Sequence, residues 1–171
     1  MKKIINAGKY DIIIEKNSLC SFGEYVKTAL GTNNAKLLIV SDDRVYSLYG
    51  DRTREALKST GFTLAEDYVF PHGEMSKNLS NLGEILRHAA DEGLTRSDCI
   101  AALGGGVTGD MAGFAAAVYL RGIKYVSVPT SILAMVDSSV GGKTAVDIPE
   151  GKNLVGAFHE PSLVLSDTAL L

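Results

Sequence analysis

The chain has 171 residues, of which 46% are hydrophobic and 22% are charged, and its net charge is −3. This length suffices for one domain with a buried core, and the chain lacks the basic field typical of nucleic-acid-binding proteins, so no nucleic-acid partner is expected. Cys20 and Cys99 both stand in apolar surroundings, a pattern that favours a reduced, cytoplasmic protein over a disulfide-stapled one.

The part of the chain up to Glu92 alternates short apolar runs with segments of helical periodicity. Met1-Lys2-Lys3 leads into a strand-like segment rather than a signal peptide. Ser18 and Ser76 are candidate helix N-caps, and Gly50 is a point where the second helix could break. The predicted strands are 10–15, 36–41 and 63–70, and the predicted helices are 18–30, 42–60 and 76–92.

The rest of the chain continues the alternation and then changes to glycine-rich loops. Within 100–120 the charge of Asp110 and several glycines argue for a buried strand and helix rather than a membrane span. Expected in order are strand 97–103, helix 107–120, strand 125–128, a short helix at 130–137, loops 138–144 and 149–153, and strand 162–165. The alternation predicts an α/β fold: one domain, 1–171, with a Rossmann-like, mostly parallel sheet and helices on both faces. Ligands should then lie beyond the carboxyl ends of the strands.

The most informative motif is the glycine turn, Gly104-Gly105-Gly106-Val107-Thr108-Gly109-Asp110, between a predicted strand and a predicted helix. Glycines there let the free N–H groups of a helix N-terminus approach a pyrophosphate, which makes dinucleotide binding the first hypothesis. The turn follows a late strand, and no acid stands about 20 residues on, where the usual fingerprint has one. We therefore expect a pyrophosphate loop in a variant topology; the alternative is a tight structural turn.

Several polar residues at predicted strand ends have two interpretations each. Asp42 is either a helix cap or an acceptor for a cofactor ribose, and Asp110 either complements a helix dipole or binds the cofactor. Glu74 and Lys77 could reach a ligand at the same sheet edge, and Ser76 between them suits an N-cap.

Three basic residues also stand at predicted loops or helix ends. Lys143 and Lys152, each beside a glycine in a polar loop, are the cations best placed to hold an anionic substrate, although a solvated lysine is the usual alternative. Arg121 lies at the end of a predicted helix, where its charge would complement the helix C-terminus. The three histidines have no metal-ligand spacing, so no metal site is expected within this chain alone.

As a set, four stretches resemble the 3-dehydroquinate synthase family. They are GGGVTGDMAGFAA at 104–116, YLRGI at 119–123, PTSILAMVDSSVGGKT at 129–144 and GKNLVGAFHEP at 151–161. The resemblance is dense across these stretches and looser before them. It implies the N-terminal, NAD-binding domain of an NAD- and metal-dependent cyclase of the shikimate pathway. That enzyme converts 3-deoxy-arabino-heptulosonate 7-phosphate, a phosphorylated sugar acid, to 3-dehydroquinate and phosphate with transient reduction of NAD.

The resemblance also implies roles for individual residues. Asp137, Lys143 and Asn153 would contact the substrate, and Lys143 and Lys152 would lie between substrate and cofactor. Arg121 would reach a substrate phosphate across the interface of a homodimer. The residues implied to hold NAD are Asp42, Glu74, Lys77, Gly105, Gly106, Asp110, Thr130, Ser131 and Leu170.

One departure from the family pattern matters for function. Family members are about twice as long, and the resemblance implies that their metal ligands, a Glu and two His that bind zinc or cobalt, lie in a helical C-terminal domain absent from this chain. We therefore expect the chain alone to bind NAD weakly and to be inactive.

Other interpretations stay open at this stage. They are another sugar-phosphate cyclase, an iron-type alcohol or glycerol dehydrogenase, and a non-catalytic nucleotide-binding module. The dehydrogenases share the glycine turn but favour Ser where Val107 stands and Lys where Gly113 stands.

Overall fold

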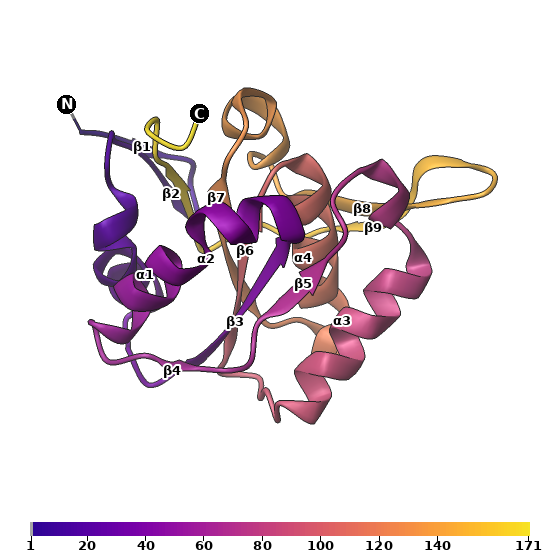
Figure 1. Cartoon of the computed structure of the whole chain (residues 1–171), viewed down its shortest axis with the longest axis horizontal. Helices are drawn as coiled ribbons and strands as arrows, with labels where there is room; N and C mark the ends of the chain where they lie inside the picture. The colour runs from indigo at the N-terminus through magenta and orange to yellow at the C-terminus, as the bar shows by residue number, and fades with distance from the viewer. Residues whose placement is uncertain (1) are drawn as a thin grey trace.

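The computed structural model describes residues 2–171, and its centre is a mostly parallel sheet (Figure 1). The strands run in the order β1-β2-β10-β7-β6-β3, and both β4 and β5 pair with β3. All of these pairs are parallel except that of β1 with β2. The bounds are β1 Lys3–Asn6, β2 Asp11–Ile14, β3 Lys36–Asp42, β4 Thr63–Leu64, β5 Tyr68–Phe70, β6 Cys99–Gly104, β7 Lys124–Pro129 and β10 Leu163–Ser166.

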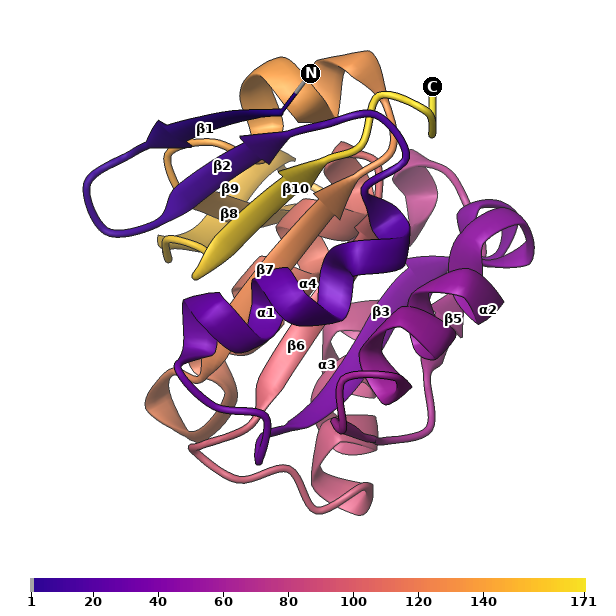
Figure 2. The ribbon, with the colours of Figure 1, turned by 90° about the vertical axis from the view of Figure 1, so that its left-hand side faces the viewer.

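Helices cover both faces of this sheet, because its central strands are apolar on both sides. In Figure 2, α1 (Phe22–Leu30) and α2 (Asp43–Lys58) lie in front of the sheet, and α3 (Leu79–Asp91) and α4 (Gly106–Val118) lie behind it. Each layer has its own core: Phe22 and Leu57 belong to the first, and Ile85 and Met111 to the second. The predicted fold class is confirmed. Residues 2–171 also form four short helices: η1 (Leu19–Ser21), η2 (Glu74–Ser76), η3 (Tyr119–Arg121) and η4 (Ala134–Ser138).

A second, two-stranded sheet packs on α4 and was not predicted. Its strands, β8 (Lys143–Ile148) and β9 (Gly151–Phe158), form an antiparallel hairpin that overlaps both expected loops, 138–144 and 149–153. Close packing requires Gly113, since a Cβ atom there would lie 2.5 Å from a side-chain carbon of Thr144. The hairpin and the sheet together bury α4 on almost all sides, which explains its nearly continuous apolar sequence.

Several local predictions were wrong in detail. The helix α2 runs unbroken through Gly50, which is buried beneath the ring of Tyr46. The helix α3 begins at Leu79, and its N-cap is Asn78, whose side chain accepts a hydrogen bond from Asn81 N; Ser76 lies in η2 instead. The segment 63–70 forms two short strands rather than one.

At the N-terminal end, η1 precedes α1, and the Ser18 side chain caps neither helix. Cys20 is exposed, contrary to the apolar setting expected for it, whereas Cys99 is buried. Within residues 2–171, no helix is long and apolar enough to cross a membrane.

Candidate functional site

The glycine turn lies at the carboxyl end of β6, in the middle of the sheet. Gly104 ends the strand, Gly105 is the N-cap of α4, and Gly106 is its first residue. A Cβ atom on Gly106 would lie 3.1 Å from the Ser138 hydroxyl, and one on Gly105 would lie 3.6 Å from that of Ser131. The two glycines are half-buried, so their main chain remains accessible at a helix N-terminus, where N–H groups favour an anion.

Residues on both sides fix this turn. Thr130 N donates a hydrogen bond of 3.0 Å to Gly104 O, which joins the end of β7 to the turn. Asp42 at the end of β3 caps α2 by accepting from Val45 N at 2.9 Å, and its other oxygen accepts from the Thr108 hydroxyl at 3.3 Å. Both interpretations of Asp42 are therefore compatible, since the capping carboxylate also lies beside the first turn of α4.

An ion pair between Lys77 and Asp110 forms the centre of the site. Their charged atoms are 2.5 Å apart, and the side chains are only 6% and 16% exposed. Lys77 also donates to Asn153 Oδ1 at 2.5 Å. The pair joins the segment just before α3 to the second turn of α4, and Asn153 adds the β8–β9 hairpin. Burial raises the pKa of the Asp110 carboxyl, and the hydrogen bond and charge of Lys77 oppose that rise.

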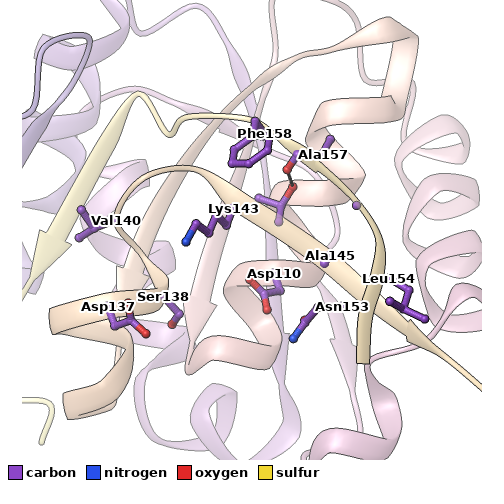
Figure 3. Close-up of a pocket in the computed structure, with 12 residues that line it drawn as sticks. Asp110, Asp137, Ser138, Val140, Lys143, Ala145, Asn153, Leu154, Ala157 and Phe158 are labelled. Carbon is purple, nitrogen blue, oxygen red and sulfur yellow. Dashed lines mark hydrogen bonds between the residues drawn. The ribbon is translucent and has the colours of Figure 1, made fainter. Parts of the chain in front are cut away.

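A pocket of about 520 Å³ opens beside this network. Figure 3 shows Asp110 and Asn153 on one side of it, Asp137 and Ser138 on η4 on another, and the Lys143 side chain reaching into the space between them. Lys143 forms no salt bridge with any residue in the described part of the chain. A cation without a protein partner, close to two carboxylates, suits a ligand that carries both an anionic group and hydroxyl groups.

A second ion pair, between Lys152 and Glu74, lies on the solvent side of the Lys77–Asp110–Asn153 network. Lys152, on the hairpin, lies 3.0 Å from Glu74 on η2, and the two side chains are 69% and 47% exposed. The hydrogen bond and the charge of Glu74 raise the pKa of Lys152. This pair joins the same two segments as the Lys77–Asn153 hydrogen bond, but in contact with solvent.

Two of the expected residues lie apart from the glycine turn, the ion-pair network and the pocket. Arg121 is exposed in η3, at the end of α4 opposite the glycine turn, with a positive φ of 68°. The Leu170 side chain is buried in the core of the α1–α2 layer, and its carbonyl accepts from the Tyr49 hydroxyl at 3.2 Å. Contact of Leu170 with a cofactor stays a prediction, as does the role of Arg121 across a dimer interface.

The structure adds two residues that the sequence did not single out. Ser138 lines the pocket and also faces Gly106. Asp147, at the end of β8, accepts a hydrogen bond from Asn153 N at 2.8 Å. The sequence signal that could have identified Asp147 was an acidic residue close to the glycine-containing segment 149–153. Its contact with Asn153, however, depends on an irregular hairpin. Within residues 2–171 no group of three or more His, Cys, Asp or Glu side chains is arranged to hold a metal ion.

The fold and the glycine turn define a Rossmann-like α/β protein, and solved structures of this kind are similar to it along nearly the whole chain. A 2-deoxy-scyllo-inosose synthase in complex with carbaglucose-6-phosphate, NAD⁺ and Co²⁺ has a TM-score of 0.88 and 31% identity, covering 100% of this chain and 47% of that one. The 2-epi-5-epi-valiolone synthase of Streptomyces hygroscopicus subsp. jinggangensis, with NAD⁺ and Zn²⁺ bound, has a TM-score of 0.83 and 30% identity, covering 98% and 45%. A glycerol dehydrogenase from Schizosaccharomyces pombe, at 19% identity and a TM-score of 0.72, shares the fold over 94% of this chain and 37% of its own.

Sequence comparison places the chain within one family of this class. A family model described as 3-dehydroquinate synthase N-terminal matches residues 67–171, so the chain belongs to that family. A 3-dehydroquinate synthase from a Picosynechococcus species is 47% identical over 168 residues, or 98% of this chain and 45% of the relative. One from Lactococcus lactis subsp. cremoris is 45% identical over 162 residues, or 95% and 45%. The chain thus spans somewhat less than half the length of these curated relatives.

Proposed function

We propose that this chain is the NAD-binding half of a 3-dehydroquinate synthase, the enzyme that converts 3-deoxy-arabino-heptulosonate 7-phosphate to 3-dehydroquinate and phosphate. The observation that carries the proposal is the meeting of the glycine turn, the Lys77–Asp110 pair and the pocket around Lys143 at one edge of the sheet. The names of the relatives support the assignment.

The residues at the turn suit a dinucleotide. Gly105 and Gly106 would offer main-chain N–H groups to the paired phosphates, while Thr130 and Ser131 would border the nicotinamide end. Asp42 would accept from a ribose hydroxyl with the oxygen that faces Thr108. Bound NAD would supply a transient acceptor for a hydride from a substrate alcohol. The two similar synthase structures, 2-deoxy-scyllo-inosose synthase and 2-epi-5-epi-valiolone synthase, are described as complexes with NAD⁺, which supports this choice of cofactor.

The pocket residues suit a phosphorylated sugar acid. Lys143 would pair with an anionic group, and Asp137 and Asn153 would hydrogen bond hydroxyl groups. Lys77 and Asp110, with Glu74 and Lys152 outside them, would lie where cofactor and substrate meet. These groups position the reactants, and positioning lowers the barrier because the entropy of orientation is lost on binding rather than in the reaction.

The proposal assigns the remaining functions to polypeptide that this chain does not contain. We place a divalent metal, zinc or cobalt, in a C-terminal helical domain, and we expect little or no turnover by residues 1–171 alone. We also propose a homodimer in which Arg121 reaches the partner's substrate site, and a cytoplasmic location. A related sugar-phosphate cyclase is the second candidate, because the TM-score of 0.88 to 2-deoxy-scyllo-inosose synthase indicates a very similar scaffold.

The test compares the NAD affinity of the chain and of two alanine variants by calorimetric or NMR titration. Gly106→Ala adds a methyl group 3.1 Å from Ser138, at the point where the main chain would approach phosphate. We expect affinity to fall at least about tenfold, the loss that corresponds to about one good hydrogen bond. Gly83→Ala is the matched control, since its Cβ in α3 would meet nothing within 4 Å. Equal affinity of both variants and the parent chain would refute the site, and absence of NAD binding by the parent would refute the cofactor assignment.

A further inference from the structure

The β8–β9 hairpin contains an irregularity directly beside the pocket. Ile148 pairs with Gly151, and Val146 pairs with Val155. One residue of β8, Asp147, therefore faces the three residues 152–154 of β9, two more than a regular ladder would hold. Such bulges bend a strand and redirect its side chains, and they occur often next to active sites.

Asp147 stabilises this bulge through its carboxylate. Its Oδ1 accepts a hydrogen bond of 2.8 Å from Asn153 N. Asn153 adopts a left-handed backbone conformation with φ 57°, which asparagine tolerates better than most residues other than glycine. Because the bulge removes Asn153 from the regular ladder, the carboxylate supplies the acceptor that its N–H group would otherwise lack.

Asp147 also fixes the segment that carries Lys77. Its main-chain N donates to Lys77 O at 3.0 Å, and it forms an isolated parallel bridge with Asn78. One residue thus holds the main chain of both partners in the hydrogen bond between Lys77 Nζ and Asn153 Oδ1. With Oδ1 engaged by Lys77, the other end of the Asn153 amide is left for a ligand in the pocket, which Asn153 lines.

We infer that Asp147 is a positioning residue: by holding the bulge it sets the orientation of the Asn153 amide and keeps Lys77 against Asp110. Its link to cofactor binding rests on the function proposed above, whereas its effect on Asn153 does not. The role is geometric, so an isosteric acceptor without charge should retain it. The alternative is that the Asp147 carboxylate acts only through its negative charge on Asp110 and Lys152. In that case Asp147→Asn, which removes the charge, would abolish the effect.

The test uses two substitutions and one control in the 171-residue chain. Asp147→Ala removes the acceptor, and Asp147→Asn keeps a carbonyl oxygen at the same place without the charge. Glu150→Ala is the control, because Glu150 is exposed in the turn of the same hairpin and forms no side-chain hydrogen bond or salt bridge with the described residues. For each chain, ¹⁵N NMR measures hydrogen exchange at the Asn153 amide and the NAD dissociation constant, and circular dichroism checks the fold.

Asp147→Ala should speed exchange at Asn153 and weaken NAD binding, each by about tenfold or more, the loss expected for a hydrogen bond to a charged group. Asp147→Asn should restore most of both, and Glu150→Ala should change neither. Unchanged exchange at Asn153 in the folded Asp147→Ala variant would overturn the inference, as would an Asp147→Asn variant as impaired as Asp147→Ala. If the parent chain binds no NAD, the proposed function fails, and the exchange rates alone decide the role of Asp147.

Discussion

The ion pair between Lys77 and Asp110 gives the sharpest prediction about stability. Both side chains are almost excluded from solvent, at 6% and 16% exposure. Removing one partner of a buried pair typically costs 3–5 kcal/mol, because the other charge is left uncompensated. Asp110 keeps some contact with water, so we expect Lys77→Met to lower the free energy of unfolding by about 2–3 kcal/mol. For a chain of this length, that corresponds to a fall in Tm of about 5–10 °C.

A double-mutant cycle in urea tests the reasoning. Lys77→Met, Asp110→Asn and the double variant are compared, and the double variant should lose at least about 1 kcal/mol less than the sum of the singles. Lys152→Met is the matched control: its ion pair with Glu74 is exposed, so the unfolding midpoint should not change.

The pH dependence supplies a second check on the same pair. Lys77 opposes the rise in the pKa of Asp110 that burial causes, so Lys77→Met should raise this pKa further. An Asp whose pKa is raised on folding destabilises the protein when ionised, and this destabilisation disappears as pH falls through the raised pKa. The deficit of Lys77→Met should therefore shrink towards acid. Two results would show that the Lys77–Asp110 pair does not stabilise the protein. One is that the effects of Lys77→Met and Asp110→Asn simply add, and the other is that the loss of stability in Lys77→Met does not vary with pH.

Three further predictions concern packing and burial elsewhere in the chain. Gly113→Ala should destabilise the protein by about 1–3 kcal/mol in urea unfolding, since the new methyl group would overlap Thr144. The control Gly83→Ala should be neutral or stabilising. Equal effects of the two substitutions would contradict the contact between α4 and the hairpin. Burial and a neighbouring carboxylate raise the pKa of Tyr46 to about 12, so the free energy of unfolding should fall as pH rises from 10 towards 12. Tyr46→Phe should make this fall with pH less steep. A ¹³C-tyrosine titration that gives Tyr46 an ordinary pKa would contradict the prediction. Asp167 is fully buried and accepts three main-chain N–H bonds. Asp167→Ala should therefore lower the free energy of unfolding by about 3 kcal/mol or more, measured by the same urea assay. A loss below about 1 kcal/mol would show that those bonds contribute little.

The central sheet was predictable because its strands have a strong local signal. The unbroken apolar run from Leu37 to Val40 and the glycine turn after Leu103 both indicate buried parallel strands that lead to helices. The β8–β9 hairpin lacked such a signal. Every residue of β9 is exposed or half-buried, and the hairpin gains its stability from packing on α4, which periodicity along the chain does not reveal.

The candidate site was predictable in composition but not in geometry. The resemblance identified Lys77, Asp110 and Asn153 as separate residues, and their meeting in one network depends on how α3, α4 and the hairpin pack. The contribution of Asp147 was missed because it depends on a bulge and on one residue in a left-handed conformation. Neither has a reliable signature in an isolated sequence.

The most direct test of the central claim is an NMR titration of the ¹⁵N-labelled chain with NAD⁺, followed residue by residue. If the exposed main chain at the start of α4 binds the pyrophosphate, the Gly105 and Gly106 amides should show the largest shifts and saturate together with Lys77. Shifts concentrated elsewhere, or no shift at these two amides when NAD⁺ saturates the chain, would contradict the account.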